Sequence, residues 1–160
     1  MGASGVTGRD DQPGDLPLLE PHQFAELVRQ ATDDQLREGL AANGELILGE
    51  IFRRMPEQFD ARRAASVDAV VEWRVRSSTG GDDCERQLVM SGGRCTLVEV
   101  PGENATVTYE IEDVDFIRLI TGGESGPKLF LYGRLRIRGN LILAARMPSF
   151  FRVPGVPEGG

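Results

Sequence analysis

Residues 116–147 read FIRLITGGESGPKLFLYGRLRIRGNLILAARM, and this stretch decides the fold. Apolar residues at helical spacing over 116–120 stop at Gly122, which predicts a short helix. Pro127 suits the first turn of a second short helix. Leu135 and Ile137 alternate with arginines and predict a strand, after which Asn140 caps a last helix that is apolar on most sides. The stretch therefore predicts helices that cover one face of a sheet.

Further strands are predicted upstream, where the period of the apolar residues is two. The cleanest alternation lies over 71–75 and 107–111, and a hairpin is predicted from 84–90 and 94–100 around Gly92-Gly93. We expect these pieces to form an antiparallel meander of about four strands, with the strand at 135–137 as the fifth. If Met90 faces Arg94, the two cysteines, Cys84 and Cys95, are too far out of register for a disulfide.

Helical signals dominate the first third of the chain. Phe24 and Val28 indicate a short helix, and the spacing of Thr32 and Gln35 is that of a capping box that opens a second helix, which Asn43 ends. A third helix follows over 47–55. The prediction is thus an α+β fold: a five-stranded, mostly antiparallel sheet with one face covered by helices, plus N-terminal helices. The predicted divisions of the chain are 1–20 as a disordered tail, 21–153 as one domain (helices in 21–60, core in 67–151) and 154–160 as a second tail.

Charge and composition limit the classes of function. The chain has 160 residues and a net charge of −7, yet six cations and no acid lie between Ser125 and Pro157. An acidic body argues against nucleic-acid binding. The longest apolar run, 141–145, is far shorter than the about 20 residues that span a membrane. With no secretory signal and no expected disulfide, we expect a reduced, cytoplasmic protein.

The stretch from Val67 to Phe151 resembles the sterol carrier protein type 2 domain. The motifs that carry the resemblance are an acidic-capped helix from Asp115-Phe116 to Thr121-Gly122, the strand motif 133–140 (GRLRIRGN) and the helix motif 143–147 (LAARM). The resemblance covers about 85 residues, leaves the helices at 33–55 unexplained and looks bacterial in type. It implies an apolar tunnel between the sheet and the helices, which holds fatty acids, fatty acyl thioesters, sterols or similar lipids.

Apolar residues of the matched region are the candidate tunnel walls, because each buried ligand methylene contributes about 0.8 kcal/mol. The alternative for each of them is a place in a solid core. Phe150 and Phe151 are a lid at the tunnel mouth or a pair that touches a membrane, unless they pack against the leading helices. The predicted walls are Trp73, Leu97, Phe116, Ile120, Leu129, Leu135, Ile137, Leu141, Ala144, Met147, Phe150 and Phe151.

No catalytic residue, metal site or cofactor is predicted. The single histidine, His22, lies outside the matched region, and the cysteines have no ligand spacing. The predicted function is non-enzymatic binding or transfer of a hydrophobic ligand. The alternative is an accessory module that presents a lipid or natural-product intermediate to a partner enzyme, with the helices at 24–55 as its docking surface. A weaker third reading is an enzyme that acts through shape and desolvation.

The basic stretch suggests a further contact. The face of Arg134, Arg136 and Arg138, or else Arg146, could meet an acidic head group or an anionic membrane surface. The alternative is a solvated strand face that balances nearby acids.

Overall fold

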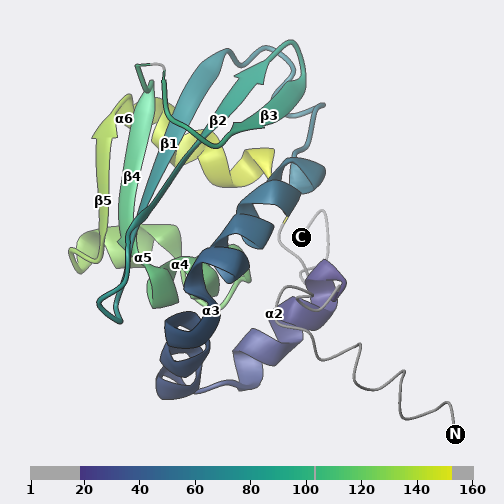
Figure 1. Ribbon diagram of the computed structural model, residues 1–160. Helices are drawn as coiled ribbons and strands as arrows, with labels where there is room; N and C mark the ends of the chain where they lie inside the picture. Colours follow the sequence, from purple (N-terminus) through teal and green to yellow (C-terminus); the bar gives the residue numbers. More distant parts are fainter. Residues whose placement is uncertain (1–18, 103, 153–160) are drawn as a thin grey trace, which may run out of the picture.

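One five-stranded sheet organises the protein, in the order β3-β2-β1-β4-β5 (Figure 1). The structure is a computed structural model and describes residues 19–102 and 104–152. The strands are β1 (Ala69–Arg76), β2 (Cys84–Ser91), β3 (Arg94–Val98), β4 (Val107–Glu112) and β5 (Leu135–Gly139). The helices are α2 (Pro21–Gln30), α3 (Asp33–Arg54), α4 (Asp113–Ile120), α5 (Gly126–Leu131) and α6 (Leu141–Arg146), with 3-10 turns η1 (Met55–Gln58) and η2 (Met147–Phe150).

The fold is α+β, as the sequence predicts, but the meander is wrong. Strand β4 pairs with β1 in parallel, and the other three pairings are antiparallel. The chain reaches this place because the connection from β3 to β4 crosses the sheet, in front of β1 and β2 in Figure 1. Thr106 fixes the end of the crossing: its N–H donates to the Val70 carbonyl at 2.7 Å and its hydroxyl accepts from the Val70 N–H at 3.0 Å.

The β2–β3 hairpin shows why the predicted register is wrong by one residue. Gly92 and Gly93 both have positive φ, 59° and 78°, as a tight two-residue turn requires. Ser91 therefore faces Arg94, and Met90 faces Cys95. Both cysteines are free.

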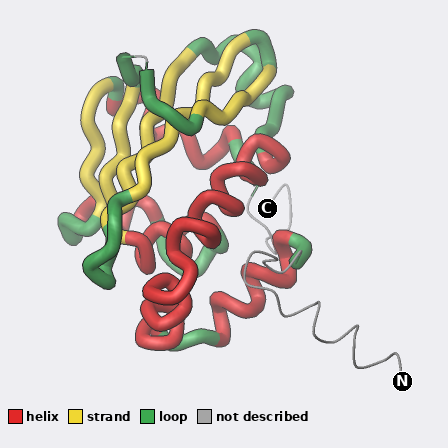
Figure 2. Tube along the Cα trace, in the orientation of Figure 1, coloured by secondary structure: helices red, strands yellow, loops and turns green. Residues whose placement is uncertain are grey.

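The predicted capping box that opens the second helix is confirmed. The Thr32 hydroxyl accepts from the Gln35 N–H at 3.1 Å, and the Gln35 side chain accepts from the Thr32 N–H at 2.9 Å. The predicted break after this helix is only a kink: Asn43 has φ −143° and ψ 35°, and the helix continues as α3 to Arg54. Figure 2 shows α3 as one long element beside α2.

Two N-terminal helix caps were predicted in the C-terminal third of the chain. The predicted cap Asn140 is confirmed, because its side chain accepts from the Leu143 N–H at 2.9 Å. The predicted cap Asp113 is wrong by one residue: Glu112 is the cap, while buried Asp113 accepts from the Ser78 N–H at 3.1 Å. Gly139 is required before α6, since it has φ 98° and a Cβ there would collide with the Thr106 carbonyl.

The helices lie on the sheet face to which Val71, Trp73 and Val75 point, and these three side chains are buried. The other face is polar, and the crossing connection covers its middle. There Glu72 accepts from Gln87 at 2.9 Å and from Arg74 at 2.6 Å. Burial works against the charge of Glu72, yet these hydrogen bonds outweigh it and lower the pKa of the carboxyl.

The last helix and the chain ends complete the comparison with the predictions. Helix α6 is apolar on most sides, but it is not buried on all of them, because Leu141 and Ile142 are exposed. The predicted tails, 1–20 and 154–160, fall outside the described residues except for Leu19 and Glu20. The division into domains stays a prediction.

Candidate functional site

A cavity of about 740 Å³ lies between the sheet and the helices, and nearly all of its lining is apolar. Its floor is a row of neighbours in register: Trp73 of β1 pairs with Tyr109 of β4, which pairs with Ile137 of β5. Val71 and Leu88, partners across β1 and β2, belong to the next row along the strands and also line the cavity. The row exists because residues on one face of adjacent strands at the same register lie side by side. The volume is within the 300–1,000 Å³ range that is typical of small-molecule sites.

The two aromatic floor residues are held in fixed orientations. The rings of Trp73 and Tyr109 stack with centroids 4.6 Å apart. The Tyr109 hydroxyl donates to the Ala144 carbonyl at 3.3 Å, and burial raises the pKa of this phenol. The hydroxyl is thus satisfied by α6, which leaves the ring as apolar surface for a guest.

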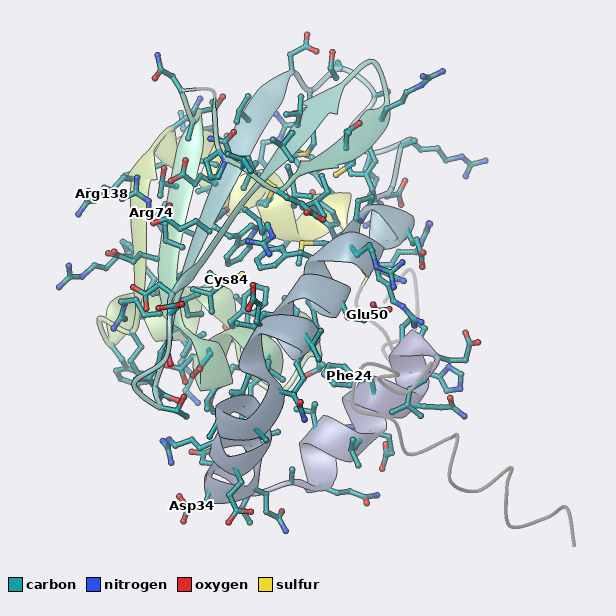
Figure 3. All side chains as sticks on the ribbon, in the orientation of Figure 1. Phe24, Asp34, Glu50, Arg74, Cys84 and Arg138 are labelled. Carbon is teal, nitrogen blue, oxygen red and sulfur yellow. The ribbon has the colours of Figure 1, made fainter. Side chains whose placement is uncertain are left out.

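Helices α2 and α3 form the opposite wall. Helix α2 is amphipathic, with Ala25 and Val28 buried, and Figure 3 shows Phe24 pointing from α2 towards α3. The side chains that α2, α3 and the first residue of η1 contribute to the lining are mostly apolar: Pro21, Phe24, Leu27, Ile47, Ile51 and Met55. Both helices start with capping boxes, so their positions at the cavity are set by local sequence as well as by packing.

Arg118 of α4 fastens the end of α2 to the body. Its guanidinium donates to the Val28 carbonyl at 3.2 Å, to the Ala31 carbonyl at 2.9 Å and to the Asp33 carboxylate at 2.8 Å. Carbonyls at a helix C-terminus lack intrahelical donors, and a cation there is also favoured by the helix dipole. One side chain therefore satisfies the C-terminal end of the helix that covers the cavity.

Polar groups gather at one end of the cavity, where α3 ends. Arg54 donates to the Glu50 carboxylate at 2.7 Å and to the Leu19 carbonyl at 2.6 Å. The hydrogen bond from Arg53 is the main cause that lowers the pKa of Glu50; burial opposes it, and the hydrogen bond from Arg54 lowers the pKa further. Gln58 and Arg152 also line this end. The arrangement leaves a charged rim on an apolar interior.

Eight of the twelve predicted wall residues line the cavity. They come from β1, α4, β5, α6 and the segment that follows α6: Trp73, Ile120, Leu135, Ile137, Leu141, Ala144, Met147 and Phe151. The other four, Leu97, Phe116, Leu129 and Phe150, are absent from the lining. Whether the eight contact a ligand stays a prediction.

Each of the four absent residues has a packing partner instead. Phe116 is fully buried between Phe52 and Trp73, with ring centroids 5.1 and 5.2 Å away. Leu129 is fully buried, and Leu97 packs half-buried against the core from β3, next to the outer edge.

Phe150 is buried as well, which argues against one of the three alternatives for residues 150–151, an exposed pair that touches a membrane. Its carbonyl accepts from the Asp60 N–H at 2.7 Å, because the chain after α6 pairs with the segment after α3. Phe151 is half-buried; it lines the cavity and packs edge-on against Phe59 at 5.6 Å.

The sequence analysis missed the whole contribution of α2 and α3, as well as Tyr109 on the floor. A signal for Tyr109 was present, since it alternates with Val107 and Ile111 in the strand that the sequence predicts. The helical spacing of Ile47 and Ile51 marked an apolar face but not what that face meets. Phe130 and Ala145 also line the cavity and were not named as walls.

The lining of the cavity offers mostly apolar surface and few polar side chains. Within 19–102 and 104–152, its lining holds no His, Cys or Ser, and no group of three metal-ligating side chains is close enough for an ion. His22 lies exposed on α2. Burial raises the pKa of the Cys95 thiol to about 11, so this thiol stays protonated at neutral pH. No helix in the described part of the chain has the length and apolarity to cross a membrane.

Most of the chain is similar in sequence to known proteins. Human sterol carrier protein 2 is 25% identical over 134 residues, which are 84% of this chain and 23% of that protein. The oleate-induced peroxisomal protein POX18 of Candida maltosa is 24% identical over 69% of this chain and 87% of its own length. The mouse peroxisomal multifunctional enzyme type 2 is 30% identical over 72% of this chain and 16% of its length. The chain thus spans about a quarter or less of the human and mouse proteins.

Solved structures agree on the fold. A sec-alkylsulfatase from Pseudomonas sp. superposes with a TM-score of 0.54 at 14% identity, over 67% of this chain and 16% of its own. The sterol carrier protein domain 2 of Helicoverpa armigera gives 0.51 at 24% identity, over 62% and 84%. The model of the SCP-2 sterol transfer family matches residues 48–152, which include all five strands and the floor of the cavity. The chain belongs to the SCP-2 sterol transfer family.

Proposed function

We propose that this protein binds and carries a hydrophobic ligand, such as a fatty acid, a fatty acyl thioester or a sterol-like lipid, in the cavity between the sheet and the helices. The observation that carries the proposal is the apolar lining of a space of about 740 Å³. A long hydrocarbon chain gains about 0.8 kcal/mol for each methylene buried there. Polar groups are few, so burial supplies the affinity and shape selects the guest.

The same wall supports binding without turnover. The Tyr109 hydroxyl is engaged by the Ala144 carbonyl, the Thr121 hydroxyl by the Ile117 carbonyl at 2.7 Å, and Glu50 by two arginines. Groups that are already paired inside the protein are poorly placed to act as acid, base or nucleophile. We therefore propose a carrier. A cytoplasmic location stays a prediction.

Among the described residues, Arg54 and Arg152 are the cations of the lining and lie at its rim, where an anionic head group would add to the partners that Arg54 already has in Glu50 and the Leu19 carbonyl. This differs from the sequence-based suggestion of Arg134, Arg136, Arg138 or Arg146, none of which lines the cavity. An acidic head would stay hydrated at the rim while its chain fills the interior.

The test is titration of the full chain with a naturally fluorescent fatty acid, in parallel with an Ile137→Asp variant. Saturable binding at low micromolar concentration or tighter, lost in the variant, is the expected result. A control variant, Val89→Asp, places the same charge on the polar face of the sheet, where Val89 is half-exposed. Absence of saturable binding by the unaltered chain, or equal binding by the Ile137 variant, would sink the proposal.

A second proposal keeps ligand binding in the cavity and adds a partner enzyme that receives the ligand. The chain would present its guest to a partner enzyme, and the observation in favour is that long relatives such as the mouse enzyme match it over only 16% of their length. Pull-down with the chain and with a Glu38→Arg, Glu45→Arg variant separates the two, because these exposed α3 residues lie outside the cavity lining. Loss of a partner with retained ligand binding favours presentation.

A further inference from the structure

Large apolar side chains stand exposed on both sides of β5. Within the described residues, eight large hydrophobics are exposed, and five of them lie just before or just after this strand. Their exposed fractions are 47% for Phe130, 81% for Leu131, 67% for Tyr132, 57% for Leu141 and 77% for Ile142. Single exposed apolar residues are ordinary, but a cluster marks a contact surface.

The two groups belong to one edge of the molecule. Strand β5 is the outermost strand, paired only with β4, and Figure 1 shows the end of α5 at one end of it and the start of α6 at the other. Five strand residues span roughly 17 Å. We call the residues from Lys128 to Ile142 on this side the β5 edge. One flat partner can therefore reach both apolar groups at once.

The β5 edge is also positive. From Lys128 to Ile142 the chain has four cations and no acid, although its net charge is −7. Two of these cations are paired: Arg134 with Asp115, and Arg136 with Glu110 at 3.8 Å. In the part of the chain that the structure describes, Lys128 and Arg138 form no ion pair, and Figure 3 shows Arg138 pointing away from the sheet.

The β5 edge is continuous with the cavity. Phe130 and Leu141 are exposed and also line it, and between them the inward side chains of β5, Leu135 and Ile137, form part of its wall. A partner that covers the β5 edge therefore lies directly against the interior. No polar barrier separates the exposed apolar groups from the lining at these two residues.

We propose that the β5 edge docks on an anionic membrane surface and that the guest passes between bilayer and cavity along this edge. The second half of the statement rests on the proposed carrier function; the first does not. Leu131, Tyr132 and Ile142 enter the boundary between head groups and acyl chains, and Lys128 and Arg138 meet lipid phosphates. Protruding apolar residues ringed by cations are the pattern of interfacial binding.

A second copy of this chain fits the surface less well than a lipid does. In a two-fold dimer the same patch meets itself, so the arginines of β5 would face the arginines of the partner copy. Like charges brought together across an interface are unfavourable. An anionic bilayer instead supplies the opposite charge along with an apolar layer.

Co-sedimentation of the full chain with vesicles tests docking. One set of vesicles is phosphatidylcholine with roughly a third phosphatidylglycerol, and the other is phosphatidylcholine alone. We expect partition into the anionic set only, weakened by added salt. Leu131→Asp combined with Ile142→Asp should weaken partition by at least about tenfold, and Arg138→Gln by roughly fivefold. The matched control is Val100→Asp, a residue 79% exposed just after β3 at the other edge of the sheet.

The outcomes separate the two proposals. Partition lost in the double variant but kept in the Val100 variant, with fatty-acid titration in vesicle-free buffer unchanged in both, supports docking by the β5 edge. Absence of partition by the unaltered chain, equal partition by the double variant, or a dimer in analytical ultracentrifugation that the double variant disrupts would overturn it. If the unaltered chain partitions to anionic vesicles but does not bind the fatty acid, the carrier function is wrong and docking stands.

Discussion

The helical face of the sheet is filled at one end of β1 and β4 and hollow in the middle. At the filled end, Val75 and Ile111 are fully buried, and the stacked rings of Phe52 and Phe116 are buried in the same core. One step along the same strands, Trp73 and Tyr109 line the cavity. Apolar side chains point from the sheet to the helices in both regions, so the apolar character of the sheet alone does not create the space.

The difference lies in the covering helices. Next to the filled region, α4 contributes Phe116, which packs edge-on against Trp73, and α3 contributes Phe52, which stacks on Phe116. Over the hollow region, α5 and α6 have six residues each, and α6 offers Ala144 and Ala145 to the interior. Small side chains on short helices cannot reach across to α2, so apolar surface remains without a protein partner. The cavity therefore exists because the covering helices leave part of the apolar sheet without packing partners.

Truncation of a ring should separate the two regions most clearly. Phe116→Ala removes a fully buried ring from the filled region and should lower the free energy of unfolding by about 3–5 kcal/mol. Phe130→Ala removes a ring from the open side of the hollow region, where 47% of the residue is exposed, and should cost less than about 1 kcal/mol. Urea unfolding measures both. Similar losses in the two variants would abolish the distinction.

Added bulk should have opposite consequences in the two regions. Ala64 is fully buried in packed surroundings, and Ala64→Phe should lower the free energy of unfolding by about 1–3 kcal/mol through overpacking. Ala144→Phe should fold with less loss, because its new ring enters the cavity, but should weaken fatty-acid binding by about tenfold as it displaces ligand methylenes.

Calorimetric or urea unfolding with parallel ligand titration checks this pair. An Ala144 variant that binds the fatty acid as well as the unaltered chain does would mean that the space near α6 is not used by the guest. An Ala64 variant of undiminished stability would mean that the region taken as filled has room of its own.

Helix α2, which covers the cavity, should open more readily when its contacts with Arg118 are removed. Arg118→Ala removes four hydrogen bonds, two to carbonyls at the end of α2 and two to the Asp33 carboxylate, so hydrogen exchange of the α2 amides should accelerate by about tenfold while the β4 amides stay protected. Release of a bound fatty acid should accelerate as well. The control is Arg37→Ala, which removes only an exposed pair with Asp34 and should leave exchange unchanged. Equal exchange in the two variants would show that Arg118 does not hold the cover.

The smallest expected effect concerns the polar rim of the hollow region. The pKa of Glu50 is lowered chiefly by the hydrogen bond from Arg53, so its stabilising contribution is present above its unfolded value of 4.5 and is lost as the pH falls through the lower folded value. Glu50→Gln should cost less than about 1 kcal/mol at pH 7, and that cost should vanish in acid. Urea unfolding at neutral and acidic pH measures the difference, and a cost that grows with acidity would contradict this assignment.

The sequence contained the strands but not their order. Alternation over 71–75 and 107–111 records which face each residue takes, and both segments are strands in the structure. The parallel pairing of β1 with β4 depends on where the β3–β4 connection crosses, and that connection carries only turn signals. The predicted register of the β2–β3 hairpin was wrong for a related reason: a tight turn at Gly92-Gly93 moves every β2 partner of β3 by one position.

The candidate site was partly predictable for similar reasons. Residues on the C-terminal motif, such as Ile137 and Ala144, could be placed at the interior because the motif fixes strand and helix faces. Apolar spacing cannot say whether a buried ring fills the core or borders a void, so Phe116 and Phe150 were expected at the wall and pack instead in the core. The share of α2 was missed because it depends on long-range contacts such as those of Arg118.

The chain contains a single tryptophan, and Trp73 lies on the cavity floor, which gives the central claim a direct optical test. A fatty acid with bromine atoms on its chain quenches indole fluorescence only at close contact. Titration of the full chain should quench Trp73 fluorescence along a saturable curve that coincides with binding measured by equilibrium dialysis, and Ala144→Phe should weaken both together. Saturable binding of the brominated acid with Trp73 emission unchanged would contradict the account, because the guest would then occupy a place other than this cavity.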